Sequence, residues 1–367
     1  MPWWSISCLT ASALKGSPPR PSYTEGVSRL RDEIWEQPGL ARGLLETATQ
    51  RVRRVAASLL ADPPGGLLIA ARGTSDHAAT YAKYLFEIRN RLTVALAAPS
   101  TFTLYRAAPR MKGFCVIGIS QSGSSPDVVA VVDAGRSQGC PTVAITNDPD
   151  SDLAQAAEHV ILLEAGPEKA IAATKTYTST LLLLAMLSQE LQPDPAFRAA
   201  LAAVPEAVER ALALEDQVMR VARVDSTRLA VLGRGFQLST AEEIALKITE
   251  TSYVTAEGQS VADFLHGPIA MVERGFPVLL LRAHGPATEG MDDLLAKLLE
   301  RGADVVTFAD RAASDATRSV VIETGLPEAL TPIPFVVAGQ VFAFHLARHR
   351  GVDPDQPRGL QKITLTR

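Results

Sequence analysis

The feature that most constrains this chain is a long-range internal repeat. Short apolar, β-rich runs alternate with stretches of helical pattern, and four runs of the first half recur in the second half at nearly one interval. Leu67 and Leu229 stand 162 positions apart, and so do Val143 and Val305. The runs are Leu67–Ala71, Phe114–Ile119, Thr142–Thr146 and Val160–Glu164, then Leu229–Leu232, Pro277–Leu281, Asp304–Phe308 and Val320–Glu323. This shared register indicates an internal duplication.

Strands that alternate with helical stretches predict an α/β fold with parallel sheets. Each copy is expected to form a doubly wound (flavodoxin-like) sheet flanked by helices. We place the first copy within residues 25–195 and the second within 196–350, joined by Pro193–Pro195 and the Ala-rich helical stretch Phe197–Val221. Residues 1–24 are expected to form a disordered or extended tail, and residues 351–367 a C-terminal tail.

Composition excludes several classes of function. The net charge of −4 over 367 residues, without clustered Lys and Arg, argues against nucleic-acid binding. No apolar run approaches the roughly 18 residues of a membrane span, so no membrane association is expected. Three cysteines and six histidines lie at no metal-ligand spacing, which predicts no metal or other cofactor. The few cysteines also suggest a reducing, cytoplasmic location.

A serine-rich loop, Ser120–Ser125, leaves one buried run and enters a helical stretch at Pro126. Ser125 suits the N-cap and Pro126 the first helical position. Backbone N–H groups at a helix N-terminus attract a phosphate dianion, and Gly123 would let the backbone approach it. Because the loop contains no Lys, it is not a Walker nucleotide site, and a phosphate monoester is the expected ligand.

The loop alone could be a plain capped turn. Gly73-Thr74-Ser75 follows another predicted strand and brings two more hydroxyls to the same edge of the sheet, which favours a phosphate site. The corresponding place in the second copy, Arg282–Pro286, has no hydroxyl. The second copy must therefore contribute something else.

The second copy offers candidate acid–base residues. Two capping-box patterns, at Ser239 and Thr240, predict a helix over Ser239–Tyr253. Within it Lys247 and Glu250 are three residues apart and share a helix face, as a solvated ion pair or as a general base beside a cation. Two further candidates, His266 in a His-Gly-Pro turn and Lys362 near the C-terminus, would by themselves be read as a structural histidine and a surface lysine.

Six motifs in order now resemble a known family. They are Gly73–Ser75, Ser120–Ser125, Ala172–Lys175, Ala245–Glu250, Leu265–Pro268 and Gln356–Lys362. The chain from about Arg29 to Arg367 resembles the sugar isomerase (SIS) family, in particular the isomerase half of glutamine-dependent glucosamine-6-phosphate synthase and the SIS-type glucosamine-6-phosphate deaminases. The resemblance implies two tandem SIS subdomains and a small-molecule sugar phosphate as ligand.

The resemblance also implies roles. Glu250 would shuttle a proton between C1 and C2 of the sugar, with Lys247 supporting charge beside it. His266 would assist ring opening, entering from the neighbouring subunit of a homodimer. Lys362 would form a Schiff base with the ketose, which reverses its reading as a surface residue. The residues implied to hold the 6-phosphate are Thr74, Ser75, Ser120, Gln121, Ser122 and Ser125, and those implied to contact the sugar are Ile171, Ala172 and Ala173.

Two departures from the synthase pattern are Ser124-Ser125 in place of Glu-Thr, and Ala173 in place of Ser. The start Met1-Pro2-Trp3 also lacks the synthase's N-terminal glutaminase cysteine, so we expect no ammonia from glutamine by that route. The expected activity is glucosamine-6-phosphate deaminase, giving fructose-6-phosphate and ammonia. The alternatives are action on galactosamine-6-phosphate, on a fructosyl-amine phosphate (a deglycase) or on a simple hexose phosphate. An alternative of another class is a non-catalytic phosphosugar-binding sensor.

Overall fold

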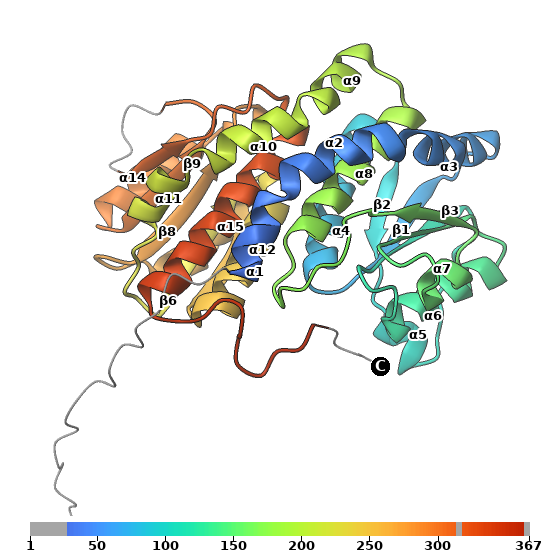
Figure 1. Cartoon of the computed structure of the whole chain (residues 1–367), viewed down its shortest axis with the longest axis horizontal. Helices are drawn as coiled ribbons and strands as arrows, with labels where there is room; N and C mark the ends of the chain where they lie inside the picture. Colours follow the sequence, from blue (N-terminus) through green and yellow to red (C-terminus); the bar gives the residue numbers. More distant parts are fainter. Residues whose placement is uncertain (1–27, 313–317, 363–367) are drawn as a thin grey trace, which may run out of the picture.

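The computed structural model describes residues 28–312 and 318–362, in which two parallel sheets lie side by side with helices around them (Figure 1). The expected tail at residues 1–24 lies outside the described residues, as do the last five residues of the chain.

Both sheets have the same topology. The first contains β1 (Gly66–Ala70), β2 (Thr93–Leu96), β3 (Phe114–Ile119), β4 (Thr142–Thr146) and β5 (His159–Leu162), in the order β2-β1-β3-β4-β5. The second contains β6 (Arg228–Gly233), β7 (Thr255–Ser260), β8 (Pro277–Arg282), β9 (Asp304–Ala309) and β10 (Ser319–Val321), in the order β10-β9-β8-β6-β7. Counted within each sheet, both orders read 2-1-3-4-5, the doubly wound arrangement. The predicted duplication of an α/β fold is confirmed.

Sequence reasoning missed one edge strand in each sheet, β2 and β7. Thr93 and Thr255, which begin them, again stand 162 positions apart. Only Val94 is buried in β2, and β7 reads Thr-Ala-Glu-Gly-Gln-Ser with no fully buried residue. An edge strand that is buried so little carries no apolar run, which explains why both were overlooked.

The helices cover both faces of the sheets. Those before and within the first repeat are α1 (Arg29–Trp35), α2 (Gln37–Thr47), α3 (Thr49–Ala61), α4 (Thr74–Arg89), α5 (Ser100–Thr103), α6 (Pro126–Ser137), α7 (Asp152–Ala156) and α8 (Lys175–Leu191). Those of the second repeat are α12 (Gln237–Ser252), α13 (Val261–Leu265), α14 (Met291–Glu300) and α15 (Pro332–His349), with the short 3₁₀ helices η1 (Pro268–Met271), η2 (Pro286–Thr288) and η3 (Glu328–Leu330).

The connection between the repeats is broken into three helices. The single helical stretch expected over Phe197–Val221 is α9 (Pro195–Ala202), α10 (Val204–Leu212) and α11 (Glu215–Val221). The breaks fall at Ala203 and before Glu215, and Pro205 occupies the first turn of α10. A proline is tolerated in the first turn of a helix but interrupts one that continues through it, which explains why the predicted helical stretch is divided.

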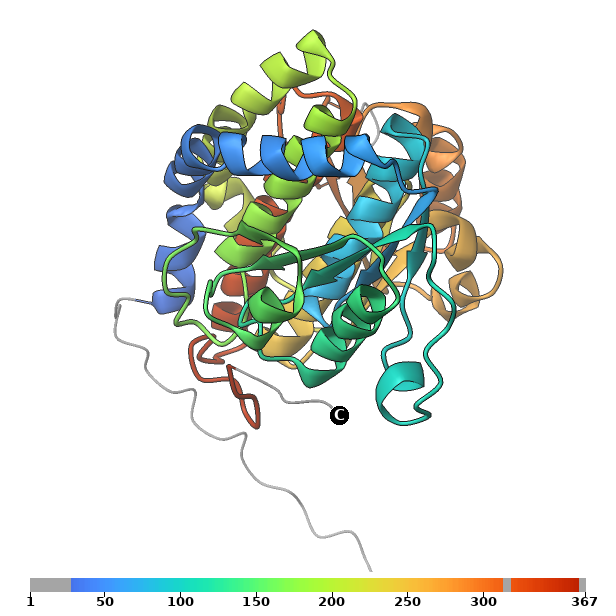
Figure 2. The same ribbon diagram turned by 90° about the vertical axis from the view of Figure 1, so that its right-hand side faces the viewer.

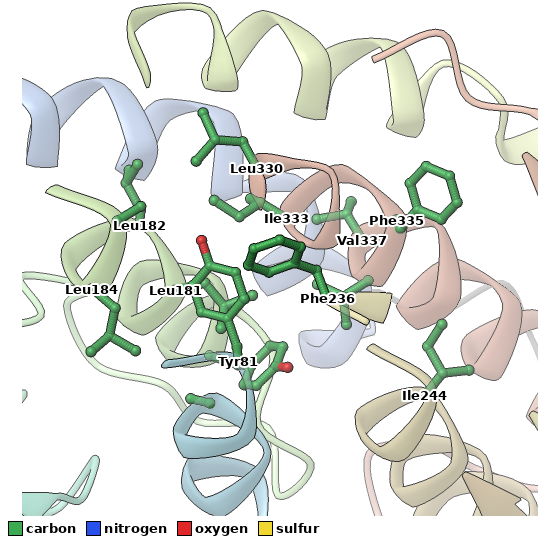
Figure 3. Packing of buried hydrophobic residues seen from close by; sticks show 14 of the residues in the cluster. Tyr81, Leu181, Leu182, Leu184, Phe236, Ile244, Leu330, Ile333, Phe335 and Val337 are labelled. Carbon is green, nitrogen blue, oxygen red and sulfur yellow. The ribbon is translucent and has the colours of Figure 1, made fainter. Parts of the chain in front are cut away.

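The two repeats share one hydrophobic core. Figure 3 shows Tyr81 of α4 beside Phe236, which precedes α12, with side chains of α8 and α15 around them. The rings of Tyr81 and Phe236 are 6.2 Å apart, and the Tyr81 hydroxyl donates to the carbonyl of Ala329 at 2.9 Å. This packing holds α4 of the first repeat directly against α12 of the second.

Helix α15 is the central element of that core. Within the described residues, the segment Glu328–His349 is the only one long and apolar enough to span a membrane, but 89% of its apolar window is buried inside the protein. Its hydropathy is therefore explained by packing against α10, α11 and α12. A cytoplasmic location stays a prediction.

Helix α12 begins earlier than predicted. It starts at Gln237, so Ser239 and Thr240 lie inside the first turn and neither forms a capping box. The Ser239 hydroxyl instead donates to the carbonyl of Phe236 at 3.0 Å. The shift leaves Glu243 within the body of the helix, where it is buried against α4.

Candidate functional site

A cavity of about 410 Å³ opens where strands β1 and β3 end. Its walls come from the loops after those strands, from the beginning of α8, from α12 and from the C-terminal segment. Figures 1 and 2 show this last segment running from the end of α15 back toward the first repeat. The residues that line the cavity are Arg72, Gly73, Thr74, Ser75, Ser120, Gln121, Ser122, Ser125, Ile171, Ala173, Thr176, Tyr177, Thr180, Lys247, Glu250, Leu360, Gln361 and Lys362.

The serine loop joins β3 to α6 as predicted. Ser125 is the N-cap residue and Pro126 the first residue of α6, but no side chain caps this helix. The hydroxyls of Ser120 and Ser125 lie 3.3 Å apart at the cavity wall. Pro126 has no N–H, and the N–H groups of Val128 and Val129 already donate to Oδ1 of Asp127 and to the carbonyl of Ser125. The serine hydroxyls are therefore the groups of this loop that face the cavity, and the helix dipole favours an anion there.

Two members of the loop serve its shape. The Ser124 hydroxyl donates to the carbonyl of Ser122 at 3.2 Å, and Ser124 does not line the cavity. Gly123 has φ +64, and a Cβ on it would lie 2.1 Å from Oγ of Ser151. The glycine is required because the loop packs against the beginning of α7. The predicted close approach of its backbone to a phosphate stays a prediction.

The opposite wall carries the candidate base. Lys247 Nζ lies 2.6 Å from Oε2 of Glu250, and the two side chains are 2% and 22% exposed. The exposed part of Glu250 faces the cavity, whereas Lys247 is enclosed. Nζ of Lys247 also lies 3.2 Å from Oγ1 of Thr74, which connects this wall to the first repeat.

Lys247 is a permanent cation in this setting. Burial alone would lower the pKa of its ammonium group. The negative charges of Glu243 and Glu250 outweigh that effect and hold the pKa above its usual range. Lys247 can therefore supply a fixed positive charge but is a poor proton donor or acceptor.

Lys362 reaches the cavity from the C-terminal segment. Its Nζ lies 2.7 Å from Oε2 of Glu168 and donates to the carbonyl of Ala170, also at 2.7 Å. Glu168 accepts hydrogen bonds from the backbone N–H groups of Thr174 and Thr176 at the start of α8. Burial would raise the pKa of the Glu168 carboxyl, but Lys362 and these N–H groups outweigh it and hold the pKa below its usual range. Glu168 thus anchors the lysine as a charged pair.

The other predicted residues are distributed unevenly. Ile171 and Ala173 line the cavity, whereas Ala172 is 1% exposed and belongs to the hydrophobic core. His266 follows α13, is exposed, and does not line the cavity of its own chain. The structure therefore brings together the six predicted phosphate residues with Lys247, Glu250 and Lys362, but not His266.

Sequence reasoning missed several residues of the cavity wall, among them Arg72 and Tyr177. Arg72 lines the cavity beside the serine loop, and its Nε donates to the buried carboxylate of Asp127 at 2.6 Å. Tyr177 lines it from α8 and donates to the carbonyl of Ser239 at 3.3 Å. The position of Arg72 directly before Gly73-Thr74-Ser75 was the available signal. Among residues 28–312 and 318–362, no three His, Cys, Asp or Glu side chains are grouped as a metal site would require.

Comparison with known proteins agrees with this geometry. The family model of the SIS domain matches residues 60–189 and 224–349. The chain is 35% identical over 309 residues to a glutamine–fructose-6-phosphate aminotransferase (isomerizing) of Bradyrhizobium diazoefficiens, which covers 80% of this chain and 51% of that protein. The chain spans about half the length of the curated relatives it matches.

Two solved structures extend the likeness to the whole fold. A protein of Silicibacter pomeroyi DSS-3, assigned to the phosphosugar isomerases, is 37% identical and has a TM-score of 0.81, covering 90% of this chain and 100% of its own. The glucosamine-6-phosphate deaminase of Thermotoga maritima is 21% identical, with a TM-score of 0.73 and coverage of 92% and 100%. At that identity the second likeness shows the fold alone.

Proposed function

The chain belongs to the SIS domain family, and we propose that it is an enzyme of phosphosugar aldose–ketose chemistry that deaminates glucosamine-6-phosphate. The observation that carries this proposal is that Glu250, Lys247 and Lys362 meet in the same cavity as the serine loop. A site that only binds a phosphate has no use for a carboxylate and two amines placed beside it. The arrangement suits a substrate held at one end and converted at the other.

The phosphate is proposed to bind at the start of α6. Its dianion would accept hydrogen bonds from the hydroxyls of Ser75, Ser120, Ser122 and Ser125, and the dipole of α6 would favour its charge. Arg72, held by Asp127, would add a positive charge at the same end. Anchoring the phosphate fixes the distance from C6 to the reacting carbons, which lowers the entropic cost of the chemical step.

The proton transfer is proposed to use Glu250. In the open-chain aminosugar its carboxylate would take the proton from C2, giving an enolamine, and return it to C1, giving an imine at C2. O1 takes up the proton that the amino nitrogen gives up on becoming the imine, so C1 ends as a hydroxymethyl group. Water then adds to that imine carbon, and ammonia leaves as fructose-6-phosphate forms. The fixed charge of Lys247 would stabilise the negative charge that develops on O1 while C2 is deprotonated.

Lys362 is proposed to act on the carbonyl end of the sugar. An amine can form a Schiff base with a ketose, with loss of water, and so activate its carbonyl carbon. Its ion pair with Glu168 holds the lysine at the cavity wall, next to Ala170 and Ile171. The amine must leave that ion pair and lose a proton before it can attack a carbonyl.

A homodimer is proposed to complete the site. His266 is exposed and lies away from the cavity of its own chain, so a second copy could present it for ring opening. Mixing Glu250→Gln with His266→Ala protein tests this. In a mixed dimer with shared sites, one site has both an intact Glu250 and an intact His266, so activity reappears. If each chain used its own His266, both sites would stay defective and mixing would restore nothing.

Deamination rather than simple isomerisation is proposed by analogy with a protein of the same fold. The Thermotoga maritima protein with the same fold is a glucosamine-6-phosphate deaminase. Incubation with glucosamine-6-phosphate is expected to release ammonia and fructose-6-phosphate in equal amounts. Isomerisation of glucose-6-phosphate without ammonia release would rule out deamination and would mean that the protein is an aldose–ketose isomerase.

The panel should extend to galactosamine-6-phosphate and a fructosyl-amine phosphate, which test the alternative substrates. A non-catalytic sensor would bind one of these ligands and convert none. If calorimetry detects binding but no ligand of the panel is converted, the protein is a sensor and not an enzyme.

A further inference from the structure

A row of charged side chains runs from His77, near the start of α4, to the cavity. His77 Nδ1 lies 2.8 Å from Oε2 of Glu243, and the other oxygen of Glu243 lies 3.4 Å from Nζ of Lys247. Lys247 in turn pairs with Glu250 at 2.6 Å. His77 belongs to the first repeat and the other three to α12 of the second, so this row of charges crosses the boundary between the repeats.

The direction of the hydrogen bonds at Thr74 follows from the charges of its two partners in this row. An ionised carboxylate only accepts and an ammonium group only donates. The Thr74 hydroxyl therefore donates to Glu243 at 3.1 Å and accepts from Lys247 at 3.2 Å. Its proton is committed to Glu243. Thr74 also lines the cavity, so it connects this row of charges to the phosphate side of the site.

Burial makes the balance of charge consequential. The side chains of Glu243 and Lys247 are 0% and 2% exposed, so each needs a partner of opposite charge. Lys247 pairs with two carboxylates, Glu243 and Glu250, and a positive His77 would balance the second. Glu168 adds a further negative charge near Lys247, but Lys362 pairs with it. The charged groups that face His77 are Glu242, Glu243 and Lys247 of α12, with Asp76 beside it on α4.

His77 is disposed to carry that charge. Burial alone would lower the pKa of its imidazole, but the hydrogen bond and the charge of Glu243 outweigh burial and raise the pKa. At 21% exposure the ring can still exchange protons with solvent. The alternation from His77 to Glu250 is then positive, negative, positive, negative.

We propose that His77 is a positioning residue for the reaction, acting through Glu243 and Lys247 to set the charge that Glu250 experiences. The inference rests on the proposed role of Glu250 as the base. A cation at His77 occupies one oxygen of Glu243, which leaves Lys247 more strongly committed to Glu250. Glu250 is thereby held beside a positive charge, in place to accept a proton from C2.

The test is the acid limb of the pH profile of kcat. His77→Asn removes a positive charge from the row that ends at the base, so the limb is expected to move to higher pH by about half a unit or more. Glu243→Gln removes a negative charge and is expected to move it to lower pH. Lys83→Gln is the matched control, because Lys83 is an exposed cation on the same helix and its loss should leave the limb in place.

Opposite shifts support the proposal, since general damage to the site cannot move one limb in two directions. Equal profiles for wild type and both variants, or shifts in the same direction, overturn it while leaving the activity itself established. If Glu243→Gln does not fold, the shift in His77→Asn relative to Lys83→Gln decides alone. Absence of turnover in the wild type is instead a failure of the proposed function.

A measurement without substrate checks the link directly. The imidazole of His77 can be titrated by NMR in the full-length protein, with Glu242→Gln compared against Glu243→Gln. Loss of the hydrogen-bonded Glu243 carboxylate should lower the pKa of His77 more than loss of Glu242. A titration of His77 that is unchanged by Glu243→Gln would overturn the proposal.

Discussion

The loops after β3 and β8 occupy the same place in two sheets of the same topology, yet they differ in what they offer a ligand. After β3 the chain enters α6 at Pro126, with serines before the first turn. After β8 it makes the short helix η2, and α14 begins only at Met291. A carboxylate oxygen of Glu328 lies 3.3 Å from the backbone nitrogen of Ala287 in that second loop.

In the second repeat a carboxylate of the protein contacts this loop, whereas the serine loop of the first repeat lines the cavity. A Cβ on Gly285 would lie 2.3 Å from that Glu328 side chain, so the carboxylate packs directly on the loop. The shared topology supplies a sheet edge in both repeats, and a few side chains decide whether that edge receives an anion. The second repeat contributes Lys247 and Glu250 from α12 in place of an anion loop.

A carboxylate introduced into the serine loop after β3 should make that loop as unfavourable for a phosphate as the loop after β8. In Ser122→Asp the new charge would repel the phosphate as Glu328 would in the second repeat. We expect KM for the phosphosugar to rise at least about 100-fold, because like charges a few ångströms apart cost several kcal/mol in a half-buried site. Ser122→Asn has a similar size without the charge and should cost about tenfold or less. Steady-state kinetics on both variants is the measurement, and equal KM values would show that charge does not decide.

The shape of the first loop depends on Gly123. An alanine there combines an unfavourable backbone conformation with a clash against Ser151, so Gly123→Ala should lower the free energy of unfolding by about 3 kcal/mol. Gly139 at the other end of α6 has φ +74 but open space around it. Gly139→Ala should therefore cost only about 1 kcal/mol. Urea unfolding of both variants distinguishes these values, and similar losses would mean that the Ser151 contact relaxes without cost.

The arginines that follow β1 and β6, Arg72 and Arg234, are expected to differ least in their effect on KM. Arg72 lines the cavity, whereas its counterpart Arg234, 162 positions later, donates to the carbonyl of Glu289 at 2.6 Å. Arg72→Ala should raise KM about tenfold with little change in kcat, as expected for loss of one half-exposed charge contact to phosphate. Arg234→Ala should leave KM unchanged. A larger KM effect at Arg234 would contradict the proposed division between the repeats.

The parts of the fold that sequence predicted are those with local signals. Buried central strands have apolar runs, and the Ser120–Ser125 loop and the Lys247–Glu250 pair are visible within a few residues. The edge strands β2 and β7 have no such run because little of either is buried. These elements became evident only from the topology.

Contacts across the chain could not be predicted in the same way. Glu168 and Lys362 are 194 positions apart, and His77 and Glu243 are 166 apart. Each of these residues looks like an ordinary polar residue of a helix or loop until the packing of α4 on α12, or the return of the C-terminal segment, brings its partner to it. His266 shows the converse, since its motif is clear but its own chain gives it no place in the cavity.

The central claim is that the first repeat holds the phosphosugar and the second repeat moves its proton. The most direct test is Glu250→Gln, assayed for turnover of glucosamine-6-phosphate and for binding of the same sugar by calorimetry. We predict that kcat falls about 1,000-fold, as for loss of a general base, while the dissociation constant stays within about twofold. Turnover at the wild-type rate, or loss of binding in step with loss of turnover, would contradict the account.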